Sequence, residues 1–543
     1  MTQTGLDQET RTMILDTINS LKNELLTREK ILELDDKNEF PLEIVKELLS
    51  DRIGLQMVFI PEEFGGLGGG ALDTYYVSVE LAKICLGVAT AFLAIHLGAE
   101  PILLFGTKEQ KQKWLAKIVN EAAIVAYAVT EADAGSNLDA IKTKAEPMTD
   151  ESGNIVSYRL NGSKQFISNG GYADFLTLLA KAPEGATFFI VDGKSTGLKR
   201  GKPEHKHGIR AANTSPLTLE NVIVPTENIV GGIPGVGLKQ ANDVFSYTRL
   251  MVAAFGLGAG LSAMEKAIQF AKTRIQFGTP LIEKQGYTHK LLVPNVVRLT
   301  AAQAYIEEIA KRVDSGDTDI LVEGSIAKYF ATEAGNIAAE AAIQALGGYG
   351  YMHDYEVEKI KRDVRITMIY EGTSEIQQNI IYLYRWRTTV KSKGEFYQKM
   401  AQEMRTIAEQ SNLESAKIVA QALELLNDLI MFAHNQKLTR QQHIQFLLSD
   451  VITWSEVAAA LVRKTAEHLR DSAPDANQLR SVLRIFVAEM ARLISNKGME
   501  IILGSETVNE EIKEEWIEKI KCLDIVSAKR NIIDTMNNIV ELL

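Results

Sequence analysis

The stretch from Lys361 to Gln377, KRDVRITMIYEGTSEIQ, places one carboxylate, Glu371, between an aromatic residue and a Gly-Thr-Ser turn. The charged run ahead of it, Arg362, Asp363 and Arg365, predicts a helix that ends just before the carboxylate. A glutamate on a tight turn after a helix can face a pocket, where apolar neighbours raise its pKa and suit it to general-base chemistry. The alternative for Glu371 is a solvated surface carboxylate or a helix N-cap.

The composition is that of a soluble globular protein with several domains. A chain of 543 residues exceeds one ordinary core, which predicts roughly two to four domains. A net charge of −11 argues against a nucleic-acid binder, because neutralising phosphates needs a concentrated basic face. The two cysteines, Cys85 and Cys522, predict neither a disulfide framework nor a Cys-based metal site. Among the eight histidines, His205 and His207 lie close in sequence but precede no further ligand set, so we predict no metal.

The first residues carry no secretory signal, because no basic region precedes an apolar run. Acidic residues come early, which is unlike a transit peptide. The chain has no uninterrupted apolar stretch long enough for a transmembrane helix, so no membrane span is predicted. These features predict a cytoplasmic protein.

The periodicity of apolar residues changes twice along the chain. It is helical from Gln8 to about Val119, apart from a glycine-dense segment, 60–71, which predicts a plain loop rather than a phosphate cradle because no Lys-Thr pair follows. From about Ala122 it becomes that of short β-strands separated by turns, including Asn161-Gly162. Long alanine-rich helices return from Leu238 and predict a bundle.

The last part of the chain is helical again after a polar junction that follows Trp386. Gly256, Gly258 and Gly260 imitate a nucleotide-binding fingerprint, but no strand precedes them, so close packing between helices is the better interpretation. The predicted fold class is α+β, mainly α. We predict an N-terminal helical domain (1–124), an antiparallel β-barrel or sandwich (125–234), a four-helix bundle carrying Glu371 (235–388) and an additional C-terminal helical domain (389–543).

Ile369-Tyr370-Glu371-Gly372-Thr373-Ser374 resembles the signature of the acyl-CoA dehydrogenase family, in which the Glu removes the α-proton of an acyl-CoA thioester. The order of helical, β and helical regions is also that of the family. In architecture the chain is most similar to very-long-chain acyl-CoA dehydrogenases, which also add a helical C-terminal domain. By this resemblance the protein binds FAD and oxidises a saturated acyl-CoA to its trans-2-enoyl-CoA.

Two segments of the β region resemble parts of the family that line the flavin. In the first, Tyr127 to Ser136, Ala132-Asp133 replaces the common Pro-Gly. In the second, Asn161 to Gly170, Phe166 stands where the family has Trp, which keeps an apolar wall but loses an indole donor. The alternative for Phe166 is an ordinary core aromatic. The resemblance assigns these residues to the flavin: Tyr127, Val129, Thr130, Gly135, Ser136, Phe166, Ile167 and Ser168.

Two helical-region segments resemble the family's contacts with the adenine end of the cofactor. Arg274 can pair with a pyrophosphate and Phe277 can pack on an adenine. In the family this pair reaches the flavin of a neighbouring subunit, which implies a homodimer or a tetramer; the alternative for Arg274 is a surface charge. A glycine turn near Tyr349 resembles the other segment. Further residues implied in cofactor binding are Gln344, Leu346, Gly347, Gly348, Thr373 and Glu375.

The resemblance also implies a substrate site. Arg249 enters an apolar helix face, and in the family an Arg at this position lies close to the base. Some relatives carry the base immediately before this Arg; that position is Thr248 here, so Glu371 keeps the role. The residues implied in substrate binding are Ser136, Tyr247, Arg249, Tyr370, Glu371 and Gly372.

The activity implied is the family's step in fatty acid β-oxidation. Glu371 takes the α-proton, the β-hydride passes to flavin N5, and electrons leave to an electron-transfer flavoprotein. Leu86 to Pro101 contains no Arg for a second carboxylate on the substrate, which favours a neutral, long acyl chain and a tail that can touch membranes peripherally. The alternatives are a catalytically idle flavin-binding scaffold and an acyl-CoA oxidase.

Overall fold

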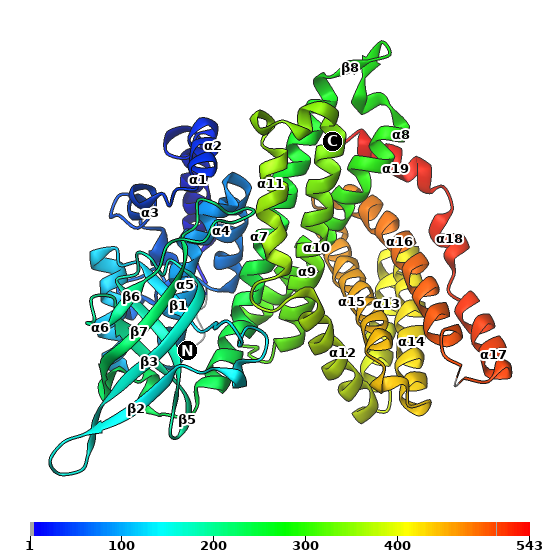
Figure 1. The fold of residues 1–543 in the computed structure, drawn as a ribbon. Coiled ribbons are helices and arrows are strands. Elements are labelled where there is room, and N and C mark those ends of the chain that lie inside the picture. The colour runs from blue at the N-terminus through cyan, green and yellow to red at the C-terminus, as the bar shows by residue number, and fades with distance from the viewer. Residues whose placement is uncertain (1–4, 507) are drawn as a thin grey trace. The chain divides into compact units, whose positions relative to one another are not determined.

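The computed structural model describes residues 5–506 and 508–543 (Figure 1). The chain forms two compact units, each assembled from separated segments. The first unit comprises Met1–Ala259, Ala310–Leu321 and Glu358–Gly372. The second comprises Gly260–Ile309, Val322–Val357 and Thr373–Leu543. The predicted domain limits at 124, 234 and 388 stay predictions.

The predicted N-terminal helices are confirmed. They are α1 (Gln8–Glu24), α2 (Arg28–Lys37), α3 (Leu42–Leu48), α4 (Ala71–Ile84), α5 (Leu86–Phe105) and α6 (Lys108–Glu121). Side chains of Asp7, Thr27 and Thr107 cap α1, α2 and α6, accepting hydrogen bonds from first-turn amides. The glycine-dense segment before α4 forms a loop with a short 3₁₀ turn, Glu62–Phe64, as expected.

The β region forms one seven-stranded sheet in the order β1-β4-β2-β3-β7-β6, with β5 paired to β4. Its strands are β1 (Val125–Ala128), β2 (Lys144–Thr149), β3 (Ile155–Ser168), β4 (Phe175–Ala182), β5 (Gly185–Asp192), β6 (Leu198–Arg200) and β7 (Thr214–Pro225). The expectation of a wholly antiparallel sheet is wrong, because β4 is parallel to both β1 and β2. Neither pair is joined by a hairpin, so no tight turn forces them antiparallel.

The predicted turn at Asn161-Gly162 is also wrong, since both residues lie inside the long strand β3. The register between β3 and β7 shifts here, which makes the pair an irregularity within the strand. Asn161 bonds across to Asn221 through both its amide oxygen and nitrogen. A Cβ on Gly162 would lie 2.6 Å from Thr143 Oγ1, so close backbone approach explains this glycine.

Long helices follow the sheet, as predicted. They are α7 (Gly237–Thr273), α9 (Val293–Asp314), α10 (Leu321–Leu346), α11 (Val357–Val364) and α12 (Ser374–Lys391). The glycines of the nucleotide-like pattern lie within α7, and a Cβ on Gly258 would lie 2.5 Å from the carbonyl oxygen of Val79 on α4. Close packing between helices is therefore confirmed at Gly258. After α7, the short strands β8 (Ile275–Gln276) and β9 (Thr279–Pro280) form a projecting hairpin (Figure 1).

The remaining helices belong to the second unit, as α13 (Glu395–Ser411), α14 (Glu414–Asn435), α15 (Gln442–Arg470), α16 (Ala476–Leu503), α17 (Glu510–Lys521), α18 (Ile525–Lys529) and α19 (Ile532–Val540). A buried ion-pair network connects this region to α10 and α12. Arg385 donates to Glu456 at 2.7 Å and to Glu323 at 3.1 Å, and Tyr397 donates to Glu456 at 2.9 Å. The C-terminal helices are therefore joined to the rest of the unit by satisfied polar contacts.

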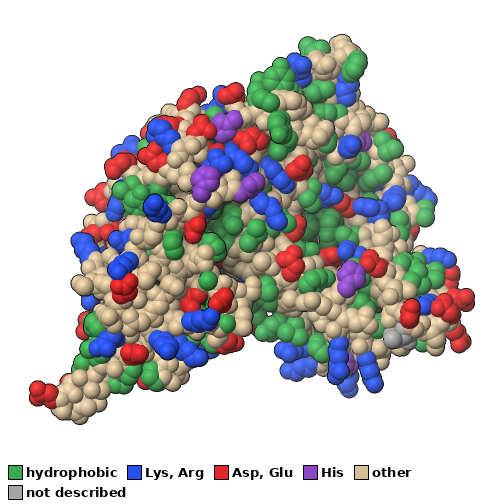
Figure 2. Space-filling model, viewed as in Figure 1, with side chains coloured by type: hydrophobic (Ala, Val, Ile, Leu, Met, Phe, Trp, Pro, Cys, Tyr) green, Lys and Arg blue, Asp and Glu red, His purple; other side chains and the backbone are tan. Residues whose placement is uncertain are grey.

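Three helices, α5, α7 and α15, are long and apolar enough to cross a membrane. In each of them 78% of the most apolar window is buried inside the protein. Figure 2 shows charged side chains of both signs spread over one face of the molecule, with hydrophobic side chains between them. Packing within the fold accounts for the apolar character of the three helices.

Candidate active site

Glu371 lies on the turn between a 3₁₀ segment, Arg365–Met368, and α12. Its backbone has a φ of +53°, a left-handed conformation that side chains with a Cβ rarely adopt. Such strain costs on the order of 1–3 kcal/mol and persists where the surrounding structure imposes it, commonly at functional sites. The side chain is half-buried. The predicted helix-to-turn placement of Glu371 is confirmed.

The hydroxyl of Thr248, on α7, donates a hydrogen bond to Glu371 Oε2 at 2.7 Å. Thr248 is buried, and Arg249 beside it is buried as well. The sequence drew attention to this position only as the place where some relatives carry their base. It did not indicate that the threonine would contact Glu371. The contact fixes one carboxylate oxygen of Glu371 and so limits rotation of the carboxylate.

Two tyrosine hydroxyls lie close enough to Glu371 to sense its charge. Burial raises the pKa of Tyr127 well above its usual value, and the charge of Glu371 raises it further. Burial and the same charge raise the pKa of Tyr370. The ring of Tyr127 packs edge-on against Phe245 of α7, with centroids 5.7 Å apart. The end of β1, helix α7 and the Glu371 turn therefore meet in the first unit.

The Tyr127 hydroxyl is buried without a hydrogen-bond partner among the residues that the structure describes. Burying an unpaired hydroxyl costs free energy, so a polar ligand at this point would relieve the cost. This observation fits a bound molecule with hydrogen-bonding edges next to Glu371, such as a flavin or a thioester.

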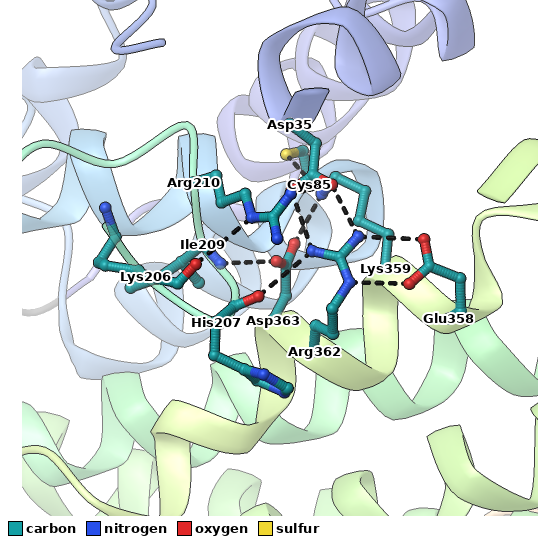
Figure 3. Close-up of polar contacts among 10 residues, drawn as sticks. All are labelled: Asp35, Cys85, Lys206, His207, Ile209, Arg210, Glu358, Lys359, Arg362 and Asp363. Atoms are coloured by element: carbon teal, nitrogen blue, oxygen red, sulfur yellow. Dashed lines mark hydrogen bonds and ion pairs between the residues drawn. The ribbon is translucent and has the colours of Figure 1, made fainter. Parts of the chain in front are cut away.

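The helix that leads to Glu371, α11, is anchored by Asp363 (Figure 3). Asp363 accepts hydrogen bonds of 2.6 Å from the Ile209 amide and from Lys359 Nζ. Burial lowers the pKa of Lys359, but the charge of Asp363 outweighs it, so the net shift is upward and the lysine stays charged. Lys359 Nζ also lies 3.5 Å from Cys85 Sγ. This buried pair fixes α11 against the loop before β7 and against the start of α5.

Arg362, the residue before Asp363, forms a second anchor (Figure 3). It donates to Asp35 of α2 at 2.7 Å and to Glu358 of α11 at 2.7 Å. It also donates to the carbonyl oxygen of His207 at 3.3 Å. Because several segments hold α11, the strained backbone at Glu371 is supported rather than free to relax.

The two β-region segments predicted to line a flavin lie side by side. The amide of Gln165 donates to the carbonyl oxygen of Thr130 at 2.9 Å. Buried Lys164 and Glu131 form an ion pair of 2.7 Å, and Lys164 also donates to the carbonyl oxygen of Val129. Phe166 has a φ of +59° and is 57% exposed, so it is not a core aromatic.

The other residues predicted in these segments differ in exposure. Val129 and Ile167 are buried, and Tyr127, Thr130 and Ser168 are partly buried. Gly135 and Ser136 are exposed in the loop after β1. A Cβ on Gly135 would meet nothing within 4 Å, so this loop leaves space beside it.

A separate group of predicted cofactor residues lines one pocket of about 440 Å³ in the second unit. Its walls include Arg274, Gln344, Leu346, Gly347 and Gly348, all of them predicted to bind the cofactor. The Arg274 guanidinium lies 5.4 Å from the ring centroid of Tyr349. A planar cation and an aromatic ring beside exposed glycine backbone fit a phosphate-linked adenine.

The remaining predicted residues take distinct places. Phe277, at the tip of the β8–β9 hairpin, is 98% exposed with a φ of +51°. Thr373 caps α12 by accepting from the Ile376 amide at 3.4 Å, and Glu375 is exposed in the first turn of that helix. Gly372 has a φ of +90°, and Tyr247 lies next to Thr248 on α7.

Three family descriptions match the chain in order. They are the acyl-CoA dehydrogenase N-terminal domain over residues 8–122, the middle domain over residues 126–222 and the C-terminal domain over residues 235–383. An acyl-CoA dehydrogenase of Bacillus subtilis is 36% identical over 370 residues, which cover 67% of this chain and 94% of the relative. The chain belongs to the acyl-CoA dehydrogenase family, a family of oxidoreductases.

Other relatives carry names of reductases. The acryloyl-CoA reductase (NADH) of Anaerotignum propionicum is 37% identical over 64% of this chain and 88% of the relative. The caffeyl-CoA reductase-Etf complex subunit CarC of Acetobacterium woodii is 34% identical over 69% of this chain and 97% of the relative. This chain is thus similar to proteins named for either direction of the reaction.

One solved structure matches nearly the whole chain, including the C-terminal helices. It is an acyl-CoA dehydrogenase complexed with FAD from Bacillus anthracis, with a TM-score of 0.84 over 98% of this chain and 95% of that chain. The sequence identity is 24%, so the match describes the shared fold. The fold of the additional helical region is therefore one that occurs in this family.

Proposed function

We propose that the protein binds FAD and oxidises a saturated acyl-CoA thioester to its trans-2-enoyl-CoA, with Glu371 taking the α-proton. The observation that carries the proposal is the hydrogen bond from Thr248 to a strained, half-buried Glu371. A carboxylate held in this way, beside two tyrosines whose pKa values are raised, is suited to general-base chemistry.

In this proposal, separate residues of the chain orient the carboxylate, exclude water and hold the cofactor. Thr248 holds Oε2 and so restricts the orientation of the carboxylate that would take the α-proton of a bound thioester. The protonated Tyr127 and Tyr370 hydroxyls exclude water and can donate hydrogen bonds without carrying charge. Phe166 and the loop after β1 would hold the flavin ring, and Arg274 and its glycine turn would hold the adenine end. When bound, the flavin supplies the hydride chemistry.

The acyl group is neutral in this proposal. Only two ionisable side chains, His96 and Glu100, lie on α5, and burial favours the neutral form of each. A second carboxylate on the substrate would find no cation on this helix. The proposed acyl chain is long, as expected from the resemblance in architecture to very-long-chain acyl-CoA dehydrogenases.

A second candidate function is the reverse reaction, reduction of an enoyl-CoA. The names of two relatives favour it, an acryloyl-CoA reductase and a caffeyl-CoA reductase subunit. In this direction Glu371 would begin protonated and deliver its proton to the α-carbon. The same geometry suits both reactions, because a carboxylate that accepts the α-proton in dehydrogenation can return it to the α-carbon in reduction.

An anaerobic titration of the FAD-loaded protein tests the proposal. Short, long, branched and aromatic acyl-CoAs are added while the absorbance of oxidised flavin is followed, with Glu371→Gln and the exposed Glu63→Gln as variants. Rapid bleaching by one class, lost in Glu371→Gln and kept in Glu63→Gln, supports the dehydrogenase. Reoxidation of reduced protein by an enoyl-CoA, without bleaching by any saturated thioester, favours the reductase.

Two other outcomes correspond to the alternatives. Bleaching followed by stoichiometric peroxide in air indicates an acyl-CoA oxidase. Flavin that responds to no thioester in either direction indicates a catalytically idle scaffold and overturns the proposal.

The partner and assembly are part of the same proposal. We propose an electron-transfer flavoprotein as electron partner, which is supported by the relative named as a subunit of an Etf complex. The exposed Phe277 supports a homodimer or a tetramer, because a fully exposed aromatic at a hairpin tip is suited to cover by another subunit. We further propose a cytoplasmic enzyme of fatty acid β-oxidation that can contact membranes peripherally.

A further inference from the structure

His96 and Glu100 lie one turn apart on α5 and are 6% and 3% exposed. His96 Nε2 and Glu100 Oε2 are 3.3 Å apart, but without the alignment of a hydrogen bond. Both ring nitrogens of His96 and Oε2 of Glu100 lack hydrogen-bond partners among residues 5–506 and 508–543. Buried polar atoms without hydrogen-bond partners cost folding free energy, which makes the pair unusual for a purely structural role.

His96 lines two small cavities, each of about 10 Å³. This volume is that of about one water molecule. The first cavity is lined by His96 and by Thr248, the residue that bonds Glu371, together with Thr74, Tyr75, Tyr247 and three apolar residues. Polar groups therefore follow one another from Glu371 through Thr248 and this cavity to the imidazole.

The second cavity shares His96 with the first. It is lined by Gln56, whose buried Oε1 also lacks a partner in the described part of the chain, and otherwise by apolar side chains that include Phe59. An imidazole has two nitrogens and can accept a proton on one while releasing a proton from the other. A histidine that borders two water-sized cavities is placed to pass protons between them.

We propose that His96 and Glu100 form an internal proton-exchange site for Glu371, connected to it through Thr248 and a water molecule in the first cavity. This inference rests on the proposed function of Glu371. Tyr75 of α4 and Tyr247 of α7 line the first cavity with His96. The charges of Asp73 on α4 and Asp314 on α9 act on Tyr247. Asp73 is held by Arg11 at 2.6 Å and Asp314 by amides of α4, so neither is available to compete.

The step moves one proton and breaks no bond to carbon. The carboxylic acid formed on Glu371 gives its proton to Thr248 Oγ1, while Thr248 gives its own proton to the cavity water. The water passes a proton to His96, the imidazole passes a proton on to an ionised Glu100 that lies 3.3 Å away, and Glu371 returns to the carboxylate. In the opposite direction the site returns a proton to Glu371.

Burial brings the titration of Glu100, but not that of His96, close to physiological pH. It raises the pKa of Glu100 to about 8 and lowers that of His96 to about 4. At pH 7 both groups are therefore largely neutral, and above pH 8 an ionised Glu100 becomes the better proton acceptor. Proton exchange at Glu371 should consequently become faster as the pH rises through 8.

The test compares two readouts in D₂O with flavin-loaded protein and a saturated acyl-CoA that bleaches it. One is the rate of flavin bleaching, and the other is deuterium incorporated at the α-carbon of recovered thioester. In wild type the proton on Glu371 exchanges through the site, so deuterium enters. In Glu100→Gln and in His96→Gln, deuterium incorporated per flavin bleached should fall about fivefold or more, and its rise near pH 8 should disappear.

Ile95→Val is the matched control, because Ile95 is the neighbour of His96 on α5. Of the two cavities, Ile95 lines the second, which is largely apolar. It should keep the wild-type ratio. An unchanged ratio and pH dependence in both Glu100→Gln and His96→Gln would overturn the relay. A wild-type protein that never bleaches with any thioester would instead contradict the proposed function.

A readout independent of turnover examines the pair itself. Infrared difference spectra of the resting protein should contain the carbonyl stretch of a protonated carboxylic acid at pH 7 that vanishes above pH 8 and is missing in Glu100→Gln. Absence of this band in wild type would contradict a protonated Glu100, and with it the exchange site.

Discussion

The Thr248 hydroxyl and Glu371 Oε2, 123 residues apart in the chain, are joined by a hydrogen bond of 2.7 Å. The contact connects a long buried helix to a strained turn whose backbone φ is +53°. It removes rotational freedom from the carboxylate that we propose as the proton-transfer group. A hydrogen bond to a charged group contributes about 1.5–3 kcal/mol, enough to decide the orientation of the base.

Replacing Thr248 by valine keeps the shape of the side chain and removes this bond. We expect kcat/KM for the best acyl-CoA to fall roughly 10- to 100-fold, which corresponds to the loss of one hydrogen bond to a charged group. Thr248→Ser should recover most of the activity, since its hydroxyl can still donate. Equal activity in the valine and serine variants would show that the hydroxyl does not assist Glu371.

Substitution of Gly258 distinguishes a role in helix packing from a role in nucleotide binding. A Cβ at this position would lie 2.5 Å from the Val79 carbonyl oxygen and 2.9 Å from the Ala82 side chain. Gly258→Ala should therefore destabilise the protein by about 1–3 kcal/mol through overpacking. Thermal unfolding measures the loss, and FAD content per chain should not change at a temperature where the variant is folded.

Gly286→Ala is the control for Gly258, because a Cβ there would meet nothing within 4 Å. It should leave the unfolding temperature unchanged. A Gly258→Ala protein of normal stability that has lost its FAD would instead identify the glycine pattern as part of a nucleotide site.

The regular elements could be predicted from the sequence because their cause is local. Helical periodicity identified α4, α7 and α15, and the charged run before Glu371 identified the helix α11. The residues around Glu371 resemble a family signature, and this resemblance identified the candidate base. These features depend on the identity and spacing of neighbouring residues, which the sequence displays directly.

Tertiary contacts account for what could not be predicted. Asn161-Gly162 has the chemistry of a turn, yet the close approach of Thr143 and the cross-strand bonds of Asn221 keep both residues in a strand. The parallel pairing of β4 with β1 and β2 depends on the path of the whole chain. The contact of Thr248 with Glu371 and the partnerless His96 likewise join segments that no local pattern relates.

Arg274 should govern retention of the cofactor. It lines the 440 Å³ pocket beside Gly347 and Gly348, where a guanidinium can hold a phosphate through two parallel hydrogen bonds. Arg274→Ala should weaken FAD binding roughly 10- to 100-fold, and Arg274→Lys should recover it only in part. Equilibrium dialysis against FAD measures the change. The exposed Lys272→Ala, near the same helix end, should bind FAD like wild type; equal loss in both variants would indicate a general effect of charge.

Glu100 should make the protein less stable as the pH rises. Its pKa in the folded protein is about 8 against an ordinary 4.5, so the folded state binds more protons than the unfolded state between these values. The contribution of Glu100 to the free energy of unfolding is fully present below pH 4.5 and is lost as the pH rises through 8. His96, with a folded pKa of about 4 against 6.5, has the opposite slope, but only between pH 4 and 6.5.

The window from pH 6.5 to 8 therefore isolates Glu100. Over this range the wild-type free energy of unfolding should fall relative to Glu100→Gln by about 2 kcal/mol, since one pKa unit corresponds to about 1.4 kcal/mol. Urea unfolding of both proteins at several pH values measures the difference. His96→Gln is the control and should keep the wild-type slope in this window, because His96 is neutral in both states there. Parallel curves for wild type and Glu100→Gln would mean that Glu100 is ionised at neutral pH in the folded protein.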